Sequence, residues 1–240
     1  MLTCAFSPRN SKLVQMSPPI RVFRSSVGTK LLIGATGLAL VGYLLIHVAG
    51  NLVIFGGQSA FNKYAYTLED NPLLPVIEIL LALLFLTHIY KAIANFLSNQ
   101  KARPAKYEKK KRAGYTSRKS LASSTMIVTG LWLVVFLLFH VTAFRAGWGH
   151  ETPWPAGGRD LYTQELDVFH SPLTVLFYLL SMIAIGMHLW HGVSSSLQSL
   201  GVDHPRWTPR IILAGRVLAV AISGTFIVIL FWAHVMGQQQ

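Results

Sequence analysis

Five long apolar stretches restrict what this 240-residue chain can fold into. They cover residues 30–55, 73–97, 121–145, 172–197 and 211–236. A bilayer's hydrocarbon core is roughly 30 Å thick and is crossed by about 20 apolar residues in a helix. Each stretch is long enough to cross it. The sequence therefore predicts an all-α membrane protein, with five transmembrane helices in a bundle.

The composition agrees with this fold class, since 52% of the residues are hydrophobic and only 12% are charged. Soluble domains carry about twice that share of charge. We expect an N-terminal arm over residues 1–29 and one transmembrane domain over residues 30–240, with no separate soluble module. The single cysteine, Cys4, cannot form a disulfide within the chain or a cysteine metal cluster. A redox metal would have to be held by histidine.

The net charge of +12 is unevenly distributed along the chain. Basic residues gather in the arm, in the second connection over residues 101–119 and in the last connection. Most acidic residues lie in the first and third connections: Glu69, Asp70, Glu151, Asp160, Glu165 and Asp167. Cytoplasmic loops are enriched in Lys and Arg, so we expect a cytoplasmic N-terminus and an external C-terminus. This pattern favours a membrane, and not a nucleic acid, as the partner of the basic residues.

Histidine is the ionisable residue that stands out inside the predicted spans. His47, His88, His140, His188 and His191 all lie there, where ionisable groups are costly and usually functional. A single such histidine could simply bond a neighbouring carbonyl. Four helices that each carry one favour a shared role.

The depth of each histidine follows from the helical rise of about 1.5 Å per residue. His47 and His140 lie roughly 25 and 28 Å above the cytoplasmic edge, near the external face. His88 and His188 lie roughly 22 and 24 Å below the external edge, near the cytoplasmic face. Two coplanar pairs in a four-helix core are suited to two bis-histidine haems.

Small residues near these histidines would let a flat porphyrin approach the backbone, although ordinary helix packing explains them equally well. They include Gly34, Gly37, Gly42, Gly50, Gly130, Gly186 and Gly192. No internal repeat is predicted.

Several short segments around the histidines resemble one family. They are Leu45-Ile46-His47 followed by Asn51, Val76–Ile79 leading to His88, Phe139-His140, and His188 to Gly192 followed nine residues later by Gly201. These segments, from about Ser25 to the C-terminus, resemble the di-haem cytochrome b558 membrane-anchor subunit of succinate dehydrogenases and fumarate reductases.

The resemblance implies two haem b groups and assigns their iron ligands. His47 and His140 would hold the outer haem iron, and His88 and His188 the inner one. The family's ligand precedes a glycine by four residues, as His188 precedes Gly192. His191 is the alternative ligand on that span, since three residues place both on about one helix face.

The resemblance also implies partners and a location. A flavoprotein subunit that oxidises succinate and an iron–sulfur subunit would dock on the cytoplasmic face of a bacterial inner membrane, and a quinone, usually menaquinone, would accept the electrons. The basic arm and the loop over residues 101–119 suit this docking. Topogenic charge with affinity for anionic lipid explains them as well.

Glu78 is the acidic residue well inside a span, so it is the candidate proton donor to a quinone. The alternative is a structural acid that pairs across helices. Lys91 and Arg145 flank the two histidine levels and would neutralise haem propionates, or snorkel to the interface.

Three functions remain open at this point. The first is the haem-bearing anchor of a succinate:quinone oxidoreductase. The second is the di-haem cytochrome b anchor of another quinone-linked dehydrogenase, such as a formate dehydrogenase or a hydrogenase. The third is a transporter that uses its histidines as a proton relay.

Overall fold

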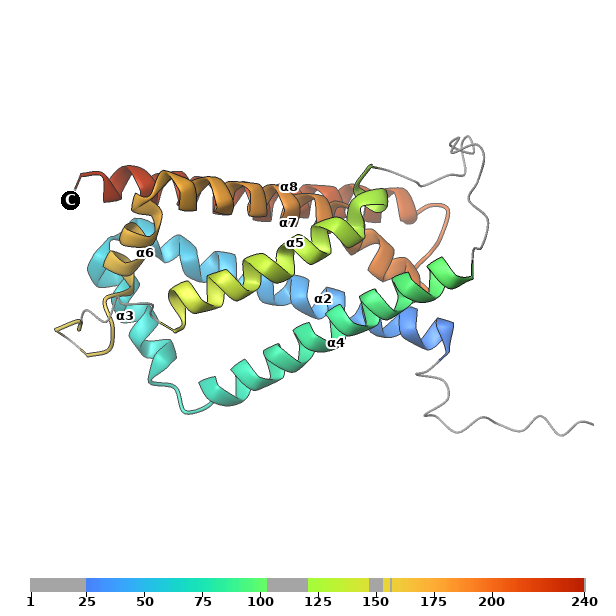
Figure 1. Cartoon of the computed structure of the whole chain (residues 1–240), viewed down its shortest axis with the longest axis horizontal. Coiled ribbons are helices and arrows are strands. Elements are labelled where there is room, and N and C mark those ends of the chain that lie inside the picture. The colour runs from blue at the N-terminus through green and yellow to red at the C-terminus, as the bar shows by residue number, and fades with distance from the viewer. Residues whose placement is uncertain (1–24, 103–120, 147–152, 156, 240) are drawn as a thin grey trace, which may run out of the picture.

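The computed structural model describes residues 25–102, 121–146, 153–155 and 157–239. Five long helices run along the molecule (Figure 1). They are α2 (Ser26–Asn51), α4 (Leu74–Lys101), α5 (Leu121–Phe144), α7 (Pro172–Ser199) and α8 (Thr208–Gly237). All five are long and apolar enough to cross a membrane. The predicted all-helical, multi-pass architecture is confirmed at this level.

The helices begin and end at residues that favour these boundaries. The Ser25 hydroxyl accepts a hydrogen bond from Gly28 N–H and caps α2. Pro172 and Pro209 stand in the first turns of α7 and α8, where a missing N–H costs little. Gly57, with φ of 84°, follows the short 3₁₀ helix η1 (Leu52–Gly56) and turns the chain away from the first span.

Two further helices, α3 (Gln58–Glu69) and α6 (Leu161–His170), were not predicted. They lie together at one end of the bundle, the left end in Figure 1, where the C-terminus also lies. We call it the α3/α6 end. Their buried faces pack Phe61, Tyr162 and Leu166 into the hydrophobic core. The first and third connections, which hold most of the acidic residues, therefore each contain a helix that packs on the bundle.

The bundle is most tightly packed around α7, which contacts α8, α5 and α2. Helix α4 packs chiefly against α2 and only lightly against α5, and none of its residues is buried. Large apolar side chains on its outside are exposed, among them Leu80, Leu83 and Leu86. Such a surface suits hydrocarbon and would not suit water.

The arm as far as residue 24, the basic loop over residues 103–120 and His150 lie outside the described residues.

Candidate functional site

His47 of α2 and His140 of α5 face each other inside the bundle. Their ring centroids are 5.8 Å apart and their planes are inclined at 83°. A metal bonded to one nitrogen of each ring at roughly 2 Å would hold the two centroids about 6 Å apart. The pair therefore has the separation of two axial ligands to one metal.

His88 of α4 and His188 of α7 are the members of the second candidate pair. Each is oriented by a threonine. Thr36 Oγ1 lies 3.1 Å from His88 Nδ1, and Thr129 Oγ1 lies 3.2 Å from His188 Nδ1.

The threonines decide which ring nitrogen is free. Thr36 donates its hydroxyl hydrogen to the Leu32 carbonyl at 2.6 Å, and Thr129 donates to the Thr125 carbonyl at 3.1 Å. Each hydroxyl can therefore only accept from the histidine, so Nδ1 carries the proton. The Nε2 lone pair is left free for a metal, in the manner of oriented metal-binding histidines.

The two pairs lie at different depths of the bundle. Thr36 precedes His47 on α2 by eleven residues, and Thr129 precedes His140 on α5 by eleven residues. Eleven residues make about three turns, or roughly 16 Å, and return to the same helix face. The pair His88–His188 thus lies roughly 16 Å from the pair His47–His140, which is nearer the α3/α6 end. This agrees with the two levels estimated from the sequence.

Those threonines and histidines belong to an internal repeat that the sequence analysis missed. Residues 36–47 read TGLALVGYLLIH and residues 129–140 read TGLWLVVFLLFH, with eight of twelve positions identical. The expectation of no internal repeat was wrong, because the repeat is one short helical segment and not a long periodic unit. It makes α2 with α4 and α5 with α7 two similar halves, and each half supplies one histidine to each pair.

Equivalent positions of the repeat also make equivalent contacts. The Tyr43 ring stacks on His47 at 5.5 Å and 13°, and the Phe136 ring stacks on His140 at 5.4 Å and 26°. The remaining polar contacts of this pair differ between the halves. Asn51 Nδ2 lies 3.4 Å from His47 Nδ1, and Tyr178 Oη lies 3.4 Å from His140 Nδ1.

The glycines of the repeat lie directly against the second pair of histidines. A Cβ atom on Gly37 would stand 3.2 Å from His88 Cε1, and one on Gly130 would stand 3.4 Å from His188 Cε1. By contrast, Gly34 approaches the backbone of α7 and Gly186 approaches Ser223 of α8, which is ordinary helix packing. Gly37 and Gly130 thus allow the close approach of the two histidine rings, whereas a role at a porphyrin stays a prediction.

His191 is placed differently from the four paired histidines. It lies on α7 one turn beyond His188, is half-buried, and its ring makes no hydrogen bond with another described residue. It lies three residues after His188, as Lys91 lies three residues after His88. If the halves correspond throughout, His191 matches a lysine and His188 matches the other histidine, which supports His188 as the ligand.

Glu78 of α4 forms an ion pair with Arg145, the residue that follows α5. Arg145 Nε lies 2.6 Å from Glu78 Oε1, and a second guanidinium nitrogen lies 3.3 Å from Oε2. This is the contact that a structural acid paired across helices would make, whereas a quinone role for Glu78 stays a prediction. Lys91 lies 5.9 Å from the Tyr90 ring, and its role at a haem propionate also stays a prediction.

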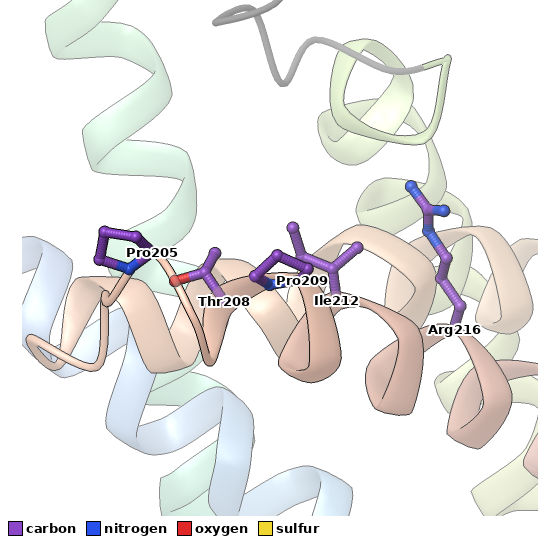
Figure 2. A pocket seen from close by; sticks show the side chains of 5 residues that line it. All are labelled: Pro205, Thr208, Pro209, Ile212 and Arg216. Atoms are coloured by element: carbon purple, nitrogen blue, oxygen red, sulfur yellow. The ribbon is translucent and has the colours of Figure 1, made fainter.

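A groove of about 360 Å³ runs along the start of α8, at the end of the bundle opposite α3 and α6 (Figure 2). Its lining consists of Pro205, Thr208, Pro209, Ile212 and Arg216. None of these is a histidine or an acid. The groove is therefore separate from the paired histidines.

Within the described residues, no group of three or more His, Cys, Asp or Glu side chains could hold a bare metal ion. A haem iron needs only two axial side chains because the porphyrin supplies its other four ligands. The two oriented pairs, with glycines against one of them, fit haem better than a bare ion.

Comparison of the chain with protein-family models, with curated proteins and with solved structures found no significant match.

Proposed function

We propose that this chain is the haem-bearing membrane anchor of a succinate:quinone oxidoreductase, with two b haems held by His47 with His140 and by His88 with His188. The observation that supports this most strongly is the repeated unit of threonine, glycine, aromatic residue and histidine on α2 and α5. Such a unit builds two similar ligand pairs at two depths. Two haem sites at different depths suit electron transfer across a bilayer better than a single site would.

Bound haem would supply a one-electron carrier, and bis-histidine ligation leaves no open position for oxygen chemistry. The chain's own residues do the positioning. Thr36 and Thr129 fix the tautomer of His88 and His188, and Tyr43 and Phe136 fix the ring planes of His47 and His140.

The charge distribution supports an orientation and a docking face. Lys101, Arg206 and Arg210 lie at the end of the bundle away from α3 and α6. We assign that end to the cytoplasm, by the enrichment of cytoplasmic loops in basic residues. The flavoprotein and iron–sulfur subunits would dock there, so that electrons enter at His88 and His188. The C-terminus would then be external.

The quinone, menaquinone in our proposal, would then react near the α3/α6 end, close to His47 and His140. Glu78 remains a candidate proton donor there, in competition with its ion pair to Arg145. Quinone reduction needs two protons for two electrons, so acids near this end are required.

Purification of the native complex from membranes through an affinity tag on this chain would test the proposal. We expect a flavoprotein and an iron–sulfur protein to co-purify, together with succinate-dependent quinone reduction. Co-purification of a formate dehydrogenase or hydrogenase catalytic subunit would assign the chain to another quinone-linked complex. A haem-free chain that moves protons would make it a transporter.

A further inference from the structure

The first three turns of α8 carry two exposed arginines, Arg210 and Arg216. Within the described part of the chain, neither guanidinium makes an ion pair or a hydrogen bond. Each lies over a tryptophan ring instead. The Arg210 guanidinium is 5.0 Å from the centroid of Trp207, and that of Arg216 is 5.3 Å from the centroid of Trp190 on α7. Such contacts hold a guanidinium in place without neutralising its charge.

The two arginines stand at different depths of the membrane. Helix α8 has 30 residues and is roughly 45 Å long, so a centred helix projects about 7 Å beyond each face of the hydrocarbon core. Arg210 lies about 3 Å from the start of the helix and therefore in the headgroup layer. Arg216 lies roughly 12 Å from that start, just inside the hydrocarbon boundary. A positive charge at that depth is costly unless it meets a negative one.

A groove of about 440 Å³ runs along α8 from Arg210 toward the middle of the helix. Apart from Arg210, its lining is entirely apolar: Leu213, Ala214, Val217, Leu218 and Ala221. These residues follow Arg210 at the spacing of one helix face and cover roughly 16 Å of the helix. That length matches one leaflet of the hydrocarbon core, about half of 30 Å. The groove therefore offers a cation at the headgroup level and an apolar track for one acyl chain below it.

Arg216 lines the other groove at the start of α8, on a neighbouring side of the same turns (Figure 2). Through Pro209 and Ile212 this groove leads from Arg216 back to Pro205, in the loop before the helix. Arg216 follows Arg210 by six residues, so the two side chains are about 120° apart around the helix. Arginine side chains near the end of a span extend toward the headgroups. A phosphate at the start of α8 thus has an arginine on each side.

Negative charge is scarce at this end of the bundle. Asp203 is the acid that the structure describes here, and its carboxylate accepts the Thr208 hydroxyl at 2.6 Å. The other described acids lie at or near the α3/α6 end: Glu69, Asp70, Glu78, Asp160, Glu165 and Asp167. The surrounding bilayer supplies phosphate at the depth of the two arginines.

We propose that the start of α8 binds one anionic phospholipid from the leaflet at this end of the bundle. Arg210 and Arg216 bind its phosphate, and one acyl chain lies along the track from Leu213 to Ala221. An anionic headgroup such as phosphatidylglycerol keeps its full negative charge for the arginines, whereas the choline of phosphatidylcholine competes with them for the phosphate. The site requires only that α8 crosses the membrane, so it does not depend on haem or on the proposed function.

Native mass spectrometry of the purified full chain tests the proposal, with phosphatidylglycerol and phosphatidylcholine of the same acyl chains as probes. We expect one phosphatidylglycerol to bind each chain more tightly than phosphatidylcholine. Arg210→Gln and Arg216→Gln should each weaken phosphatidylglycerol binding about 10-fold, the effect of losing one charged hydrogen-bond donor. Lys30→Gln is the matched control, because it removes an exposed positive charge from α2 at the same end of the bundle. It should leave the affinity unchanged.

The acyl track is tested separately. Ala214→Trp should fill the track and weaken the binding of both lipids, whereas Val228→Trp, at an exposed position farther along α8, should weaken neither. Excess inorganic phosphate should not displace phosphatidylglycerol, because it lacks an acyl chain. Equal affinity for the two lipids, unchanged affinity in both arginine variants or in Ala214→Trp, or displacement by inorganic phosphate would each overturn the proposal.

Discussion

Thr36 Oγ1 of α2 lies 3.1 Å from His88 Nδ1 of the neighbouring helix α4. Thr129 Oγ1 and His188 Nδ1 make the same contact at 3.2 Å in the other half of the bundle. Both hydroxyl hydrogens are donated to carbonyls of their own helices, so each hydroxyl accepts the hydrogen of Nδ1–H. The Nε2 lone pair of each histidine is therefore free. The two halves of the bundle therefore orient one histidine each through the same kind of contact.

Thr36→Val or Thr129→Val should leave the inner haem weakly bound, whereas the outer haem should be unaffected. Valine has the same shape but leaves Nδ1–H without an acceptor, which costs about 1–3 kcal/mol. Loss of such an orienting partner typically lowers metal affinity 10- to 100-fold. Haem titration of the purified variants would measure this. Thr142→Val is the control, because Thr142 bonds only to its own helix. An unchanged inner haem would show that the hydroxyls do not orient ligands.

Gly37→Ala should reduce occupancy of the inner haem, because the new methyl group would stand 3.2 Å from His88 Cε1 and push the ring aside. Gly42→Ala on the same helix is the matched control, since no atom lies within 4 Å of its added Cβ. The control should be neutral or more stable by up to about 1 kcal/mol, the usual gain for alanine over glycine in a helix. Haem spectra of both variants would measure the difference. Equal spectra would exclude close approach of His88 to Gly37 in the haem-bound protein.

His191→Ala should retain both haems, while His188→Ala should lose the inner one. The reason is that His188 is oriented by Thr129, and the His191 ring makes no comparable hydrogen bond to a described residue. Low-temperature absorption spectra would measure which haem each variant retains. Loss of the inner haem in His191→Ala, with retention in His188→Ala, would exchange the two assignments without removing the di-haem proposal.

Glu78→Gln and Arg145→Gln should lower stability by the same small amount, and the double variant should be no worse than either. The Glu78 side chain is 39% exposed and the Arg145 side chain is 54% exposed. Exposed ion pairs contribute about 0–1 kcal/mol to the free energy of unfolding. Thermal unfolding in detergent would measure stability, and menaquinol formation would measure activity. A loss of quinone reduction in Glu78→Gln that Arg145→Gln does not share would instead assign Glu78 to quinone protonation.

The five long helices could be predicted because apolar length is a strong local signal. Their ends were shifted by a few residues, since polar residues such as Ser26 and Lys101 extend helices beyond the hydrocarbon-like core. Helices α3 and α6 were missed because only one face of each is apolar. The signal existed in α6, where Asp160 caps the first turn and Tyr162, Leu166 and Phe169 follow at helical spacing.

The approach of His47 to His140 could be predicted from depth alone, because helical rise converts sequence position into height. The orienting threonines of the other pair could not, since a threonine inside an apolar helix usually bonds to its own backbone. Comparison of residues 36–47 with residues 129–140 would have identified Thr36 and Thr129.

The most direct test of the account is the number of haems bound by each chain, measured by pyridine haemochrome assay against protein concentration. We predict two haem b per chain. We also predict that His47→Ala and His140→Ala each remove the same one, and that His88→Ala and His188→Ala each remove the other. A ratio near one or zero in the wild-type chain would contradict the account. So would loss of different haems on substitution of His47 and His140, whose rings lie 5.8 Å apart.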